Sequence, residues 1–475
     1  MLSEDPLARR RLAYTVACLM LFFGVLFVYV TPPYQGPDET AHFHRVAMIV
    51  GGDLLPGTRD GKTAAELPKS LLRFAERHAD LQSNLKAKYD YRRMVREIGM
   101  GASSRPRAST GFPTQATSPL MYAPALAGVA AGTLLSAISF TDQDPGNWAT
   151  MQYFARLGNL FAVTLAVALA LLYLPRFHAA VTFVALMPMT MFLSSSVQYD
   201  SMSVIACLGL FVVVVRRTVF RGDFTRRELA LLAVSAFLLG HGKIVYLPLL
   251  LAIVPAALAV PWRRGIAAVG LAVGAALLGR AGSLVFTPVS GMPGDLVARQ
   301  LEFLLNDLAG IPGLIWRTLA EMHGFYFRTL FGRFGWLDTA VPPSLLILVW
   351  AMFLLALFND SRGPVRPVGA WTRLAILGGL LISLVGILLS LYVLWTPSET
   401  GAIGTPVVIG VQGRYFIPFL PFVAMMLSFN LRRFAWRVAG AIPDLMPLQL
   451  TLQAATLAVS LFVLLSRFWL GAGPP

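Results

Sequence analysis

Long apolar runs separated by short polar or basic segments dominate the chain. A membrane span needs about 20 mostly apolar residues, and many of the runs approach that length. The runs that we interpret as spans are residues 12–31, 150–174, 179–197, 201–215, 229–240, 244–260, 265–286, 343–358, 373–395, 414–430 and 449–467. This pattern predicts an all-α polytopic membrane protein with about eleven transmembrane helices, formed by residues 1–475 as a single membrane domain.

The ends of the first run and the arginine clusters indicate the orientation. The first run ends in Thr31-Pro32-Pro33 instead of a small-residue cleavage site, so we interpret it as a retained span with the N-terminus in the cytoplasm. The arginine clusters lie at 175–176, 216–227, 263–264, 362–373 and 432–437. The positive-inside rule places them all in the cytoplasm if the segment 118–140 does not cross, so we expect an interfacial helix there.

With this orientation, three segments face the outside of the membrane. The largest is 32–117, which is long enough to contain juxtamembrane helices. The second is the large outer loop 287–342, and the third is the short loop 396–412. Long loops translocate largely regardless of their charge, so the basic residues in the first of them agree with this topology.

Composition and charge remove several classes of protein. The chain is 56% hydrophobic and only 13% charged, whereas soluble domains carry about 25% charged residues. The net charge of +15 is explained by cytoplasmic arginines, and no nucleic-acid-binding motif is present. Cys18 and Cys207 form no metal-binding spacing. The composition therefore excludes soluble and disordered proteins.

The most informative polar cluster directly follows the first span. Asp38, His42 and Arg45 are spaced i, i+4 and i+7, so one helix face would carry an acid, an imidazole and a cation. Asp38 and Glu39 would lie in the first helical turn, where acids also favour the helix dipole, and an interfacial ion network is the alternative interpretation. Because ionisable groups at this depth are usually functional, we expect Asp38 to act as a general base. A metal site formed by Asp38, Glu39 and His42 is a weaker alternative.

Three further ionisable groups lie at the outer ends of spans. Lys243 is the only lysine in the membrane region and is flanked by glycine, so it either binds phosphate or snorkels towards lipid head groups. Arg414 could bind two phosphate oxygens or act as an interfacial anchor together with Tyr415. Asp200 follows a run of hydroxyl side chains and belongs either to a solvated turn or to the wall of a site.

The remaining candidates for the wall of a site are mostly aromatic. Trp336 and Asp338 belong to an outer cluster that either forms an interface belt or stacks against sugars. Tyr246, Gln412 and Tyr415 accompany the two basic candidates along the chain. All these candidates map to the outer boundary, whereas a transporter would tend to place its ionisable groups near the midplane.

Five short motifs resemble a known family. They are Pro37-Asp38-Glu39…His42-Phe43…Arg45, Gln198-Tyr199-Asp200-Ser201, Lys243-Ile244-Val245-Tyr246, Phe334-Gly335-Trp336-Leu337-Asp338 and Gln412-Gly413-Arg414-Tyr415-Phe416. The motifs resemble those of the bacterial membrane proteins called domain-of-unknown-function family 2142. That family is similar to glycosyltransferase superfamily C, whose members use polyprenyl- or dolichyl-phosphate sugars. The resemblance implies that Asp38, or else Glu39, corresponds to the catalytic acid of that superfamily.

The main hypothesis is an inverting glycosyltransferase at the outer face of a bacterial plasma membrane. It would transfer a sugar from a polyprenyl phosphate to an envelope glycan or glycolipid. Asp38 would be the base, with Glu39 or His42 positioning the acceptor, and Lys243 and Arg414 would stabilise the departing phosphate. No cofactor is required by the sequence, although a divalent metal could share that role.

Two other classes compete with this hypothesis. A transporter or flippase of a lipid-linked glycan would use the same groups to bind phosphate without cleaving a bond. A structural assembly protein of the cell envelope would leave the outward-facing Lys243 and Arg414 unexplained. Loss of Asp38 separates the first two classes, because only catalysis needs a base beside the acceptor.

Overall fold

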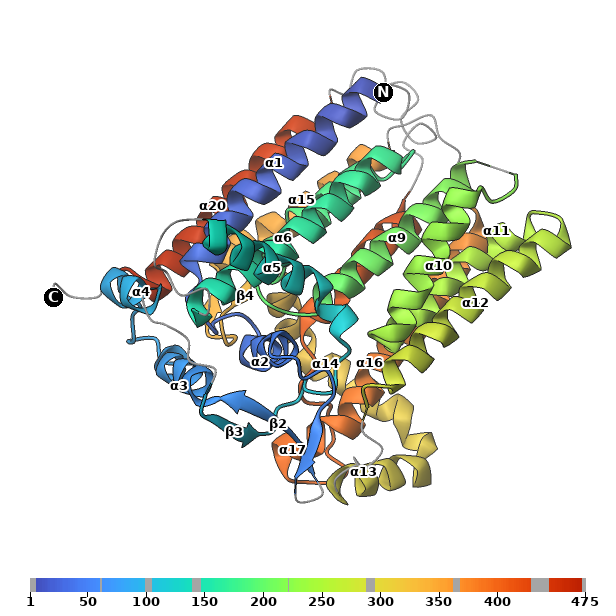
Figure 1. Cartoon of the computed structure of the whole chain (residues 1–475). Helices are drawn as coiled ribbons and strands as arrows, with labels where there is room; N and C mark the ends of the chain where they lie inside the picture. The colour runs from blue at the N-terminus through green and yellow to red at the C-terminus, as the bar shows by residue number, and fades with distance from the viewer. Residues whose placement is uncertain are drawn as a thin grey trace.

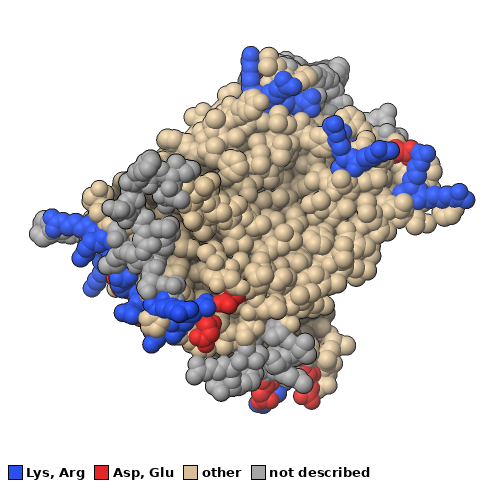
Figure 2. Space-filling model, in the orientation of Figure 1, with Lys and Arg blue, Asp and Glu red and all other residues tan. Residues whose placement is uncertain are grey.

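The computed structural model describes residues 6–59, 62–98, 105–138, 147–220, 222–287, 295–361, 368–428 and 444–471. Long helices lie side by side and run between two ends of the molecule (Figure 1). The shorter elements α2, α3, α13 and α17 and the strands β2 and β3 gather at one of these ends, at the bottom of the view. On the face shown in Figure 2, the basic residues gather at the ends, and a broad uncharged belt separates them.

Seven helices in the described part of the chain are long and apolar enough to cross a membrane. They are α1 (Pro6–Val30), α6 (Trp148–Tyr173), α9 (Asp200–Val219), α12 (Trp262–Leu284), α15 (Pro343–Ser361), α16 (Ala370–Leu394) and α20 (Met446–Phe468). Each coincides with an apolar run in the sequence. This confirms the prediction of an all-α polytopic membrane protein.

The other four predicted runs are also helical, but they are shorter or interrupted. They form α7 (His178–Ala185) with α8 (Pro188–Ser194), α10 (Arg226–His241), η3 (Ile244–Ile253) with α11 (Val254–Leu258), and η5 (Gly413–Phe419) with α18 (Leu420–Leu427). Proline explains the interruptions, because it lacks the N–H that an α-helix needs. Pro188 opens α8, and Pro248 and Pro418 lie within the 3-10 helices. The count of about eleven spans stays a prediction.

The first of the three segments predicted to face the outside, residues 32–117, contains the expected helices and also a small sheet. Its helices are α2 (Glu39–Val50), α3 (Lys69–His78), η1 (Ala79–Leu81) and α4 (Tyr91–Ile98). Its strands β1 (Gly57–Arg59), β2 (Lys62–Pro68) and β3 (Arg107–Thr110) form an antiparallel sheet in the order β1-β2-β3. The sheet was not predicted, because β3 joins β2 from about 40 residues away and no local pattern marks that pairing.

The other outer segments are shorter. Residues 287–342 contain α13 (Asp295–Asn306), η4 (Leu308–Gly310), α14 (Ile311–Phe331), β4 (Arg333–Phe334) and β5 (Thr339–Ala340). The third segment contains α17 (Thr396–Thr400). Some of the arginines that we expect to face the cytoplasm lie outside the described residues. They are Arg362, Arg366, Arg432, Arg433 and Arg437.

The segment expected to be interfacial forms η2 (Pro119–Tyr122) and α5 (Ala123–Ile138). The helix α5 packs against the first part of α6, where Gly128 and Gly158 bring the two backbones together. A Cβ atom at Gly128 would lie 2.0 Å from the carbonyl oxygen of Phe154. Glycine is therefore required for this approach, which holds α5 beside the starting end of α6.

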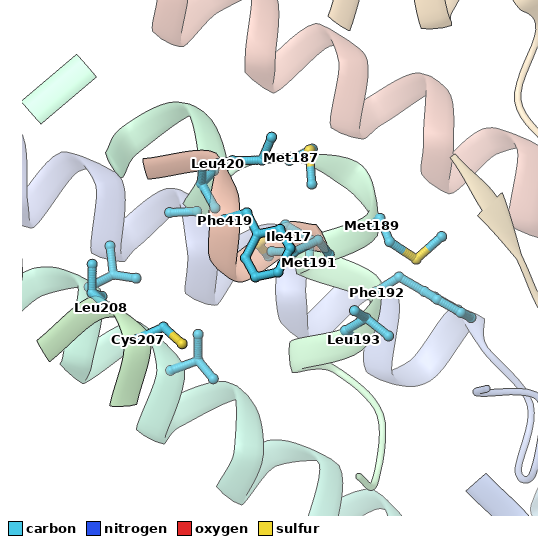
Figure 3. Close-up of a cluster of buried hydrophobic side chains, with 14 of the residues drawn as sticks. Met187, Met189, Met191, Phe192, Leu193, Cys207, Leu208, Ile417, Phe419 and Leu420 are labelled. Atoms are coloured by element: carbon cyan, nitrogen blue, oxygen red, sulfur yellow. The ribbon is translucent and has the colours of Figure 1, made fainter. Parts of the chain in front are cut away.

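The apolar core between the helices is continuous. In Figure 3, η5 passes between Met187, Met189 and Met191 on one side and Cys207 and Leu208 of α9 on the other. All five of these side chains are buried. Flexible methionines fill irregular gaps well, which suits the place where the broken α7–α8 pair meets α9.

A buried ion pair joins α1, α2 and α6. Arg156 donates to both carboxylate oxygens of Glu39 over 2.7 and 2.6 Å, and both side chains are fully buried. The remaining guanidinium hydrogens are bonded to backbone carbonyls at the end of α1, namely those of Val28, Thr31 and Pro32. A buried charge is tolerated only when it is paired and hydrogen-bonded, so this pair fixes the turn between α1 and α2.

Replacing Glu39 with Gln should destabilise the protein strongly. The amide keeps the shape of the carboxylate but leaves the Arg156 charge buried without its counter-ion, which costs about 3–5 kcal/mol. Denaturant unfolding in detergent micelles measures this loss.

Asp53→Asn is the matched control, because Asp53 is 39% exposed in its pair with Arg107 and should cost no more than about 1 kcal/mol. Equal losses in the two variants would contradict the role given to the buried pair.

Candidate functional site

A cavity of about 590 Å³ lies where the segments predicted to face the outside meet the ends of the long helices. Eight of the residues predicted from the sequence line it, and they come from five separate parts of the chain. These residues are Asp38, His42, Asp200, Lys243, Trp336, Gln412, Arg414 and Tyr415. The fold therefore brings together groups that are almost 380 residues apart in the sequence.

Two ion pairs cross this cavity. Arg414 donates to the carboxylate of Asp38, and the ammonium of Lys243 lies 2.6 Å from a carboxylate oxygen of Asp200. The Lys243 nitrogen also lies 4.6 Å from the ring centre of Tyr415, within the range of a cation–π interaction. The two ion pairs thus bring together two cations and two carboxylates, whose formal charges cancel.

The backbone at Asp38 explains how neighbouring acids come to face different surroundings. Asp38 has φ 54° and ψ 14°, in the left-handed region, and α2 begins at the next residue. Aspartate adopts this conformation more readily than most residues. The resulting turn leaves half of the Asp38 side chain exposed to the cavity, while Glu39 points into the buried pair with Arg156.

At neutral pH, Asp38 is negatively charged and His42 is neutral. Burial disfavours the charged form of Asp38, but the Arg414 guanidinium outweighs it and holds the pKa of Asp38 below its usual value. Burial lowers the pKa of His42 to about 4, although Asp38 and Asp200 oppose this shift. A neutral His42 lies with its Nδ1 2.7 Å from the hydroxyl of Tyr122. The site therefore offers a carboxylate beside an uncharged imidazole.

Four of the predicted site residues do not line the cavity. Glu39 is fully buried, and its two oxygens accept four hydrogen bonds, from Arg156 and from the backbone of Gly36 and Val197. No lone-pair direction faces the cavity in this arrangement, so Glu39 supports the fold. Because Glu39 points away from Asp38 and His42, these three residues do not converge as metal ligands. Within the described residues, no cluster of three or more His, Cys, Asp or Glu could hold a metal ion.

The other three support neighbouring loops. Arg45 donates to the carbonyl oxygens of Leu54 and Thr117 over 2.7 and 2.8 Å. The Tyr246 hydroxyl donates to the backbone oxygen of Tyr415, which places Tyr246 behind the cavity wall. Asp338 is paired with Arg467 at 2.8 Å. The prediction that Asp38, His42 and Arg45 share one helix face is wrong, because Asp38 precedes the first residue of α2.

The cavity also has walls that the sequence did not single out. They include His44, the segment 110–114 at the end of β3, Trp395 and Glu399. The Nε2 atom of His44 is buried without a hydrogen-bond partner in the described part of the chain. His44 lies in the same polar cluster as His42, so its position could have been noticed. Trp395 and Glu399 open the third outer segment, and only the fold shows that this segment reaches the site.

The fold and the site together define a polytopic helical membrane protein with a charged cavity at one end of its helices. Residues 21–423 match the family model described as a predicted membrane protein, DUF2142. The chain belongs to this family. No curated protein and no solved structure matches the chain.

The depressed pKa of His42 predicts a pH dependence of stability. The folded pKa of about 4 lies below the ordinary value of about 6.5, so the unfolded chain binds this proton first. The stabilisation is complete above about pH 6.5 and is lost as the pH falls towards the folded pKa, by about 1 kcal/mol near pH 5.5.

Unfolding measured from pH 7.5 to 5.5 should therefore show a smaller decline for His42→Gln than for wild type. His323→Gln is the control, because His323 is exposed and lies outside the cavity. Identical declines in wild type and His42→Gln would show that His42 is not held neutral.

Proposed function

We propose that this protein is a glycosyltransferase similar to superfamily C, acting at the outer face of the bacterial plasma membrane. The donor is a sugar on a polyprenyl phosphate, and the acceptor is a hydroxyl of an envelope glycan or glycolipid. One observation carries the proposal. A half-exposed carboxylate, Asp38, faces the same cavity as two cations, Lys243 and Arg414, at the end of the membrane helices.

The two cations suit a phosphate group. The guanidinium of Arg414 can bind two oxygens of one phosphate, while Lys243 adds a point charge. Both are paired with carboxylates, which keep these charges compensated when no substrate is bound. A phosphate entering the cavity competes with Asp38 for Arg414 and releases Asp38 for catalysis.

Release from Arg414 also improves Asp38 as a base. The guanidinium lowers the pKa of Asp38, so transfer of that cation to the phosphate raises the proton affinity of the carboxylate. Donor binding and base activation are thereby coupled through one residue. Asp38, and not Glu39, has this position, because the Glu39 carboxylate is saturated by its own partners.

The proposed reaction is a single displacement. The acceptor hydroxyl loses its proton to Asp38 as its oxygen attacks the anomeric carbon, and the bond from that carbon to the phosphate oxygen breaks. The electron pair of the broken bond stays on the polyprenyl phosphate. Arg414 and Lys243 stabilise this developing charge, and the configuration at the anomeric carbon inverts. A divalent metal could share the charge stabilisation.

The walls of the cavity provide contacts for sugars. Trp336 donates its indole N–H to the backbone oxygen of Tyr34 over 3.0 Å, so its remaining contribution to the cavity is ring surface. Aromatic ring faces pack well against the apolar faces of sugar rings. His42 and Gln412 add polar groups at the same cavity, which suits recognition of hydroxyls.

The same proposal includes the topology. All eleven predicted runs are helical, which supports eleven spans with a cytoplasmic N-terminus and the cavity outside. The packing of α5 along the first part of α6 supports an interfacial helix that stays near the outer boundary. A juxtamembrane helix here is also what similarity to superfamily C implies.

Donor turnover tests the proposal directly. Purified protein in lipid nanodiscs is given a panel of polyprenyl-phosphate sugars with envelope glycan as acceptor, and free polyprenyl phosphate is followed by mass spectrometry. Asp38→Asn should reduce turnover at least about a hundredfold while donor binding persists, because a general base contributes 10²–10⁴-fold. Lys243→Ala should weaken donor binding.

Asp53→Asn, an acidic residue outside the cavity, should keep wild-type turnover. Donor binding without consumption of any donor in wild type would contradict the transferase and favour a flippase of a lipid-linked glycan. Full activity in Asp38→Asn would contradict the assignment of Asp38 as the general base.

A further inference from the structure

A second large hollow lies between the helices and extends from the middle of α9 towards the end opposite the candidate site. It has a volume of about 480 Å³ and is lined by residues of α6, α9 and α10. On α6 its lining runs from Ala166 to Tyr173, the final turns of a helix whose first turns hold Arg156. We call this hollow the α6–α9–α10 groove.

The groove is almost entirely apolar. Its α9 side runs from Ile205 to Val212, and its other lining side chains are mostly leucine and alanine. The eight residues from Ile205 to Val212 span about 10 Å of helix, the length of roughly eight methylene groups of an extended chain. Its exposed leucines include Leu169, which is 55% exposed. The groove therefore has the shape and chemistry to hold part of one acyl chain.

One end of the groove is basic. Arg227 lines it at the start of α10, and this side chain has no ion-pair or hydrogen-bond partner among the described residues. The nearby Arg216 and Arg217 are both paired with the same carboxylate, that of Glu228. Figure 2 shows basic side chains gathered in the upper right, where α9 ends and α10 begins in Figure 1. The positive charge there exceeds the negative charge.

We propose that the α6–α9–α10 groove binds an anionic phospholipid from the leaflet opposite the candidate site. One acyl chain lies along the groove, and the phosphate of the head group pairs with Arg227. Basic pockets between transmembrane helices are known to bind anionic head groups, and a nearby arginine contributes appreciably to such binding. This site is independent of the proposed glycosyltransferase activity, because it shares no lining residue with the cavity at Asp38.

Lipid retention in native mass spectrometry tests the site. Purified protein in detergent is titrated with phosphatidylglycerol or, separately, phosphatidylcholine of the same chain length. Wild type should retain phosphatidylglycerol preferentially. Arg227→Gln should weaken that binding about fivefold, and Ala166→Phe, which fills the groove, should abolish it.

Two neighbouring variants are the controls. Arg226→Gln removes an adjacent arginine that does not line the groove, and Leu165→Phe adds bulk to a residue of α6 outside it. Both should bind phosphatidylglycerol as wild type does. Equal weakening by Arg226→Gln and Arg227→Gln would overturn the site, because it would indicate diffuse charge attraction. Equal retention of the two lipids would also overturn it.

Discussion

The buried pair of Glu39 and Arg156 is the interaction on which the candidate site depends. It joins the start of α2 to α6, and the same arginine closes the end of α1 through three backbone carbonyls. With Glu39 held inward, the adjacent Asp38 occupies a left-handed turn and faces the cavity. An ion pair this deeply buried is weak evidence for stability by itself, but breaking it would leave a charge without compensation. Its role is therefore to fix the geometry of the turn.

The cavity places opposite charges together where the membrane helices end. Lys243 directly precedes η3 and Arg414 lies in η5, and each meets a carboxylate there. Each carboxylate compensates the charge of a cation that is largely removed from solvent. This pairing also means that an anionic ligand must compete with Asp38 and Asp200, so binding a phosphate would change the environment of the proposed base.

Hydrophobic length alone predicted the membrane helices. The run at 12–31 becomes α1 and the run at 373–395 becomes α16, because an apolar segment of this length can satisfy its backbone only as a helix. Breaks within other runs depend on prolines such as Pro188, whose effect on the helix could not be derived from hydropathy. The sheet of β1, β2 and β3 depends on pairing between distant segments, which no local pattern reveals.

The sequence also singled out eight of the residues that line the cavity, but not the roles of their neighbours. Asp38 and Glu39 are adjacent acids, and only the positive φ of Asp38 separates the one in the cavity from the one in the buried pair. The sequence suggested Asp338 as a site residue, but in the structure it pairs with Arg467, which lies 129 residues further along the chain. Such long-range partners decide whether a polar residue supports the fold or faces a ligand.

The most direct measurement is a cryo-EM structure of the protein bound to a non-cleavable phosphonate analogue of a polyprenyl-phosphate sugar. The account predicts phosphonate oxygens within hydrogen-bond distance of Lys243 and Arg414, with the Asp38–Arg414 pair opened and the anomeric carbon facing Asp38. A bound analogue whose phosphonate lies outside this cavity, or whose sugar lies away from Asp38, would contradict it.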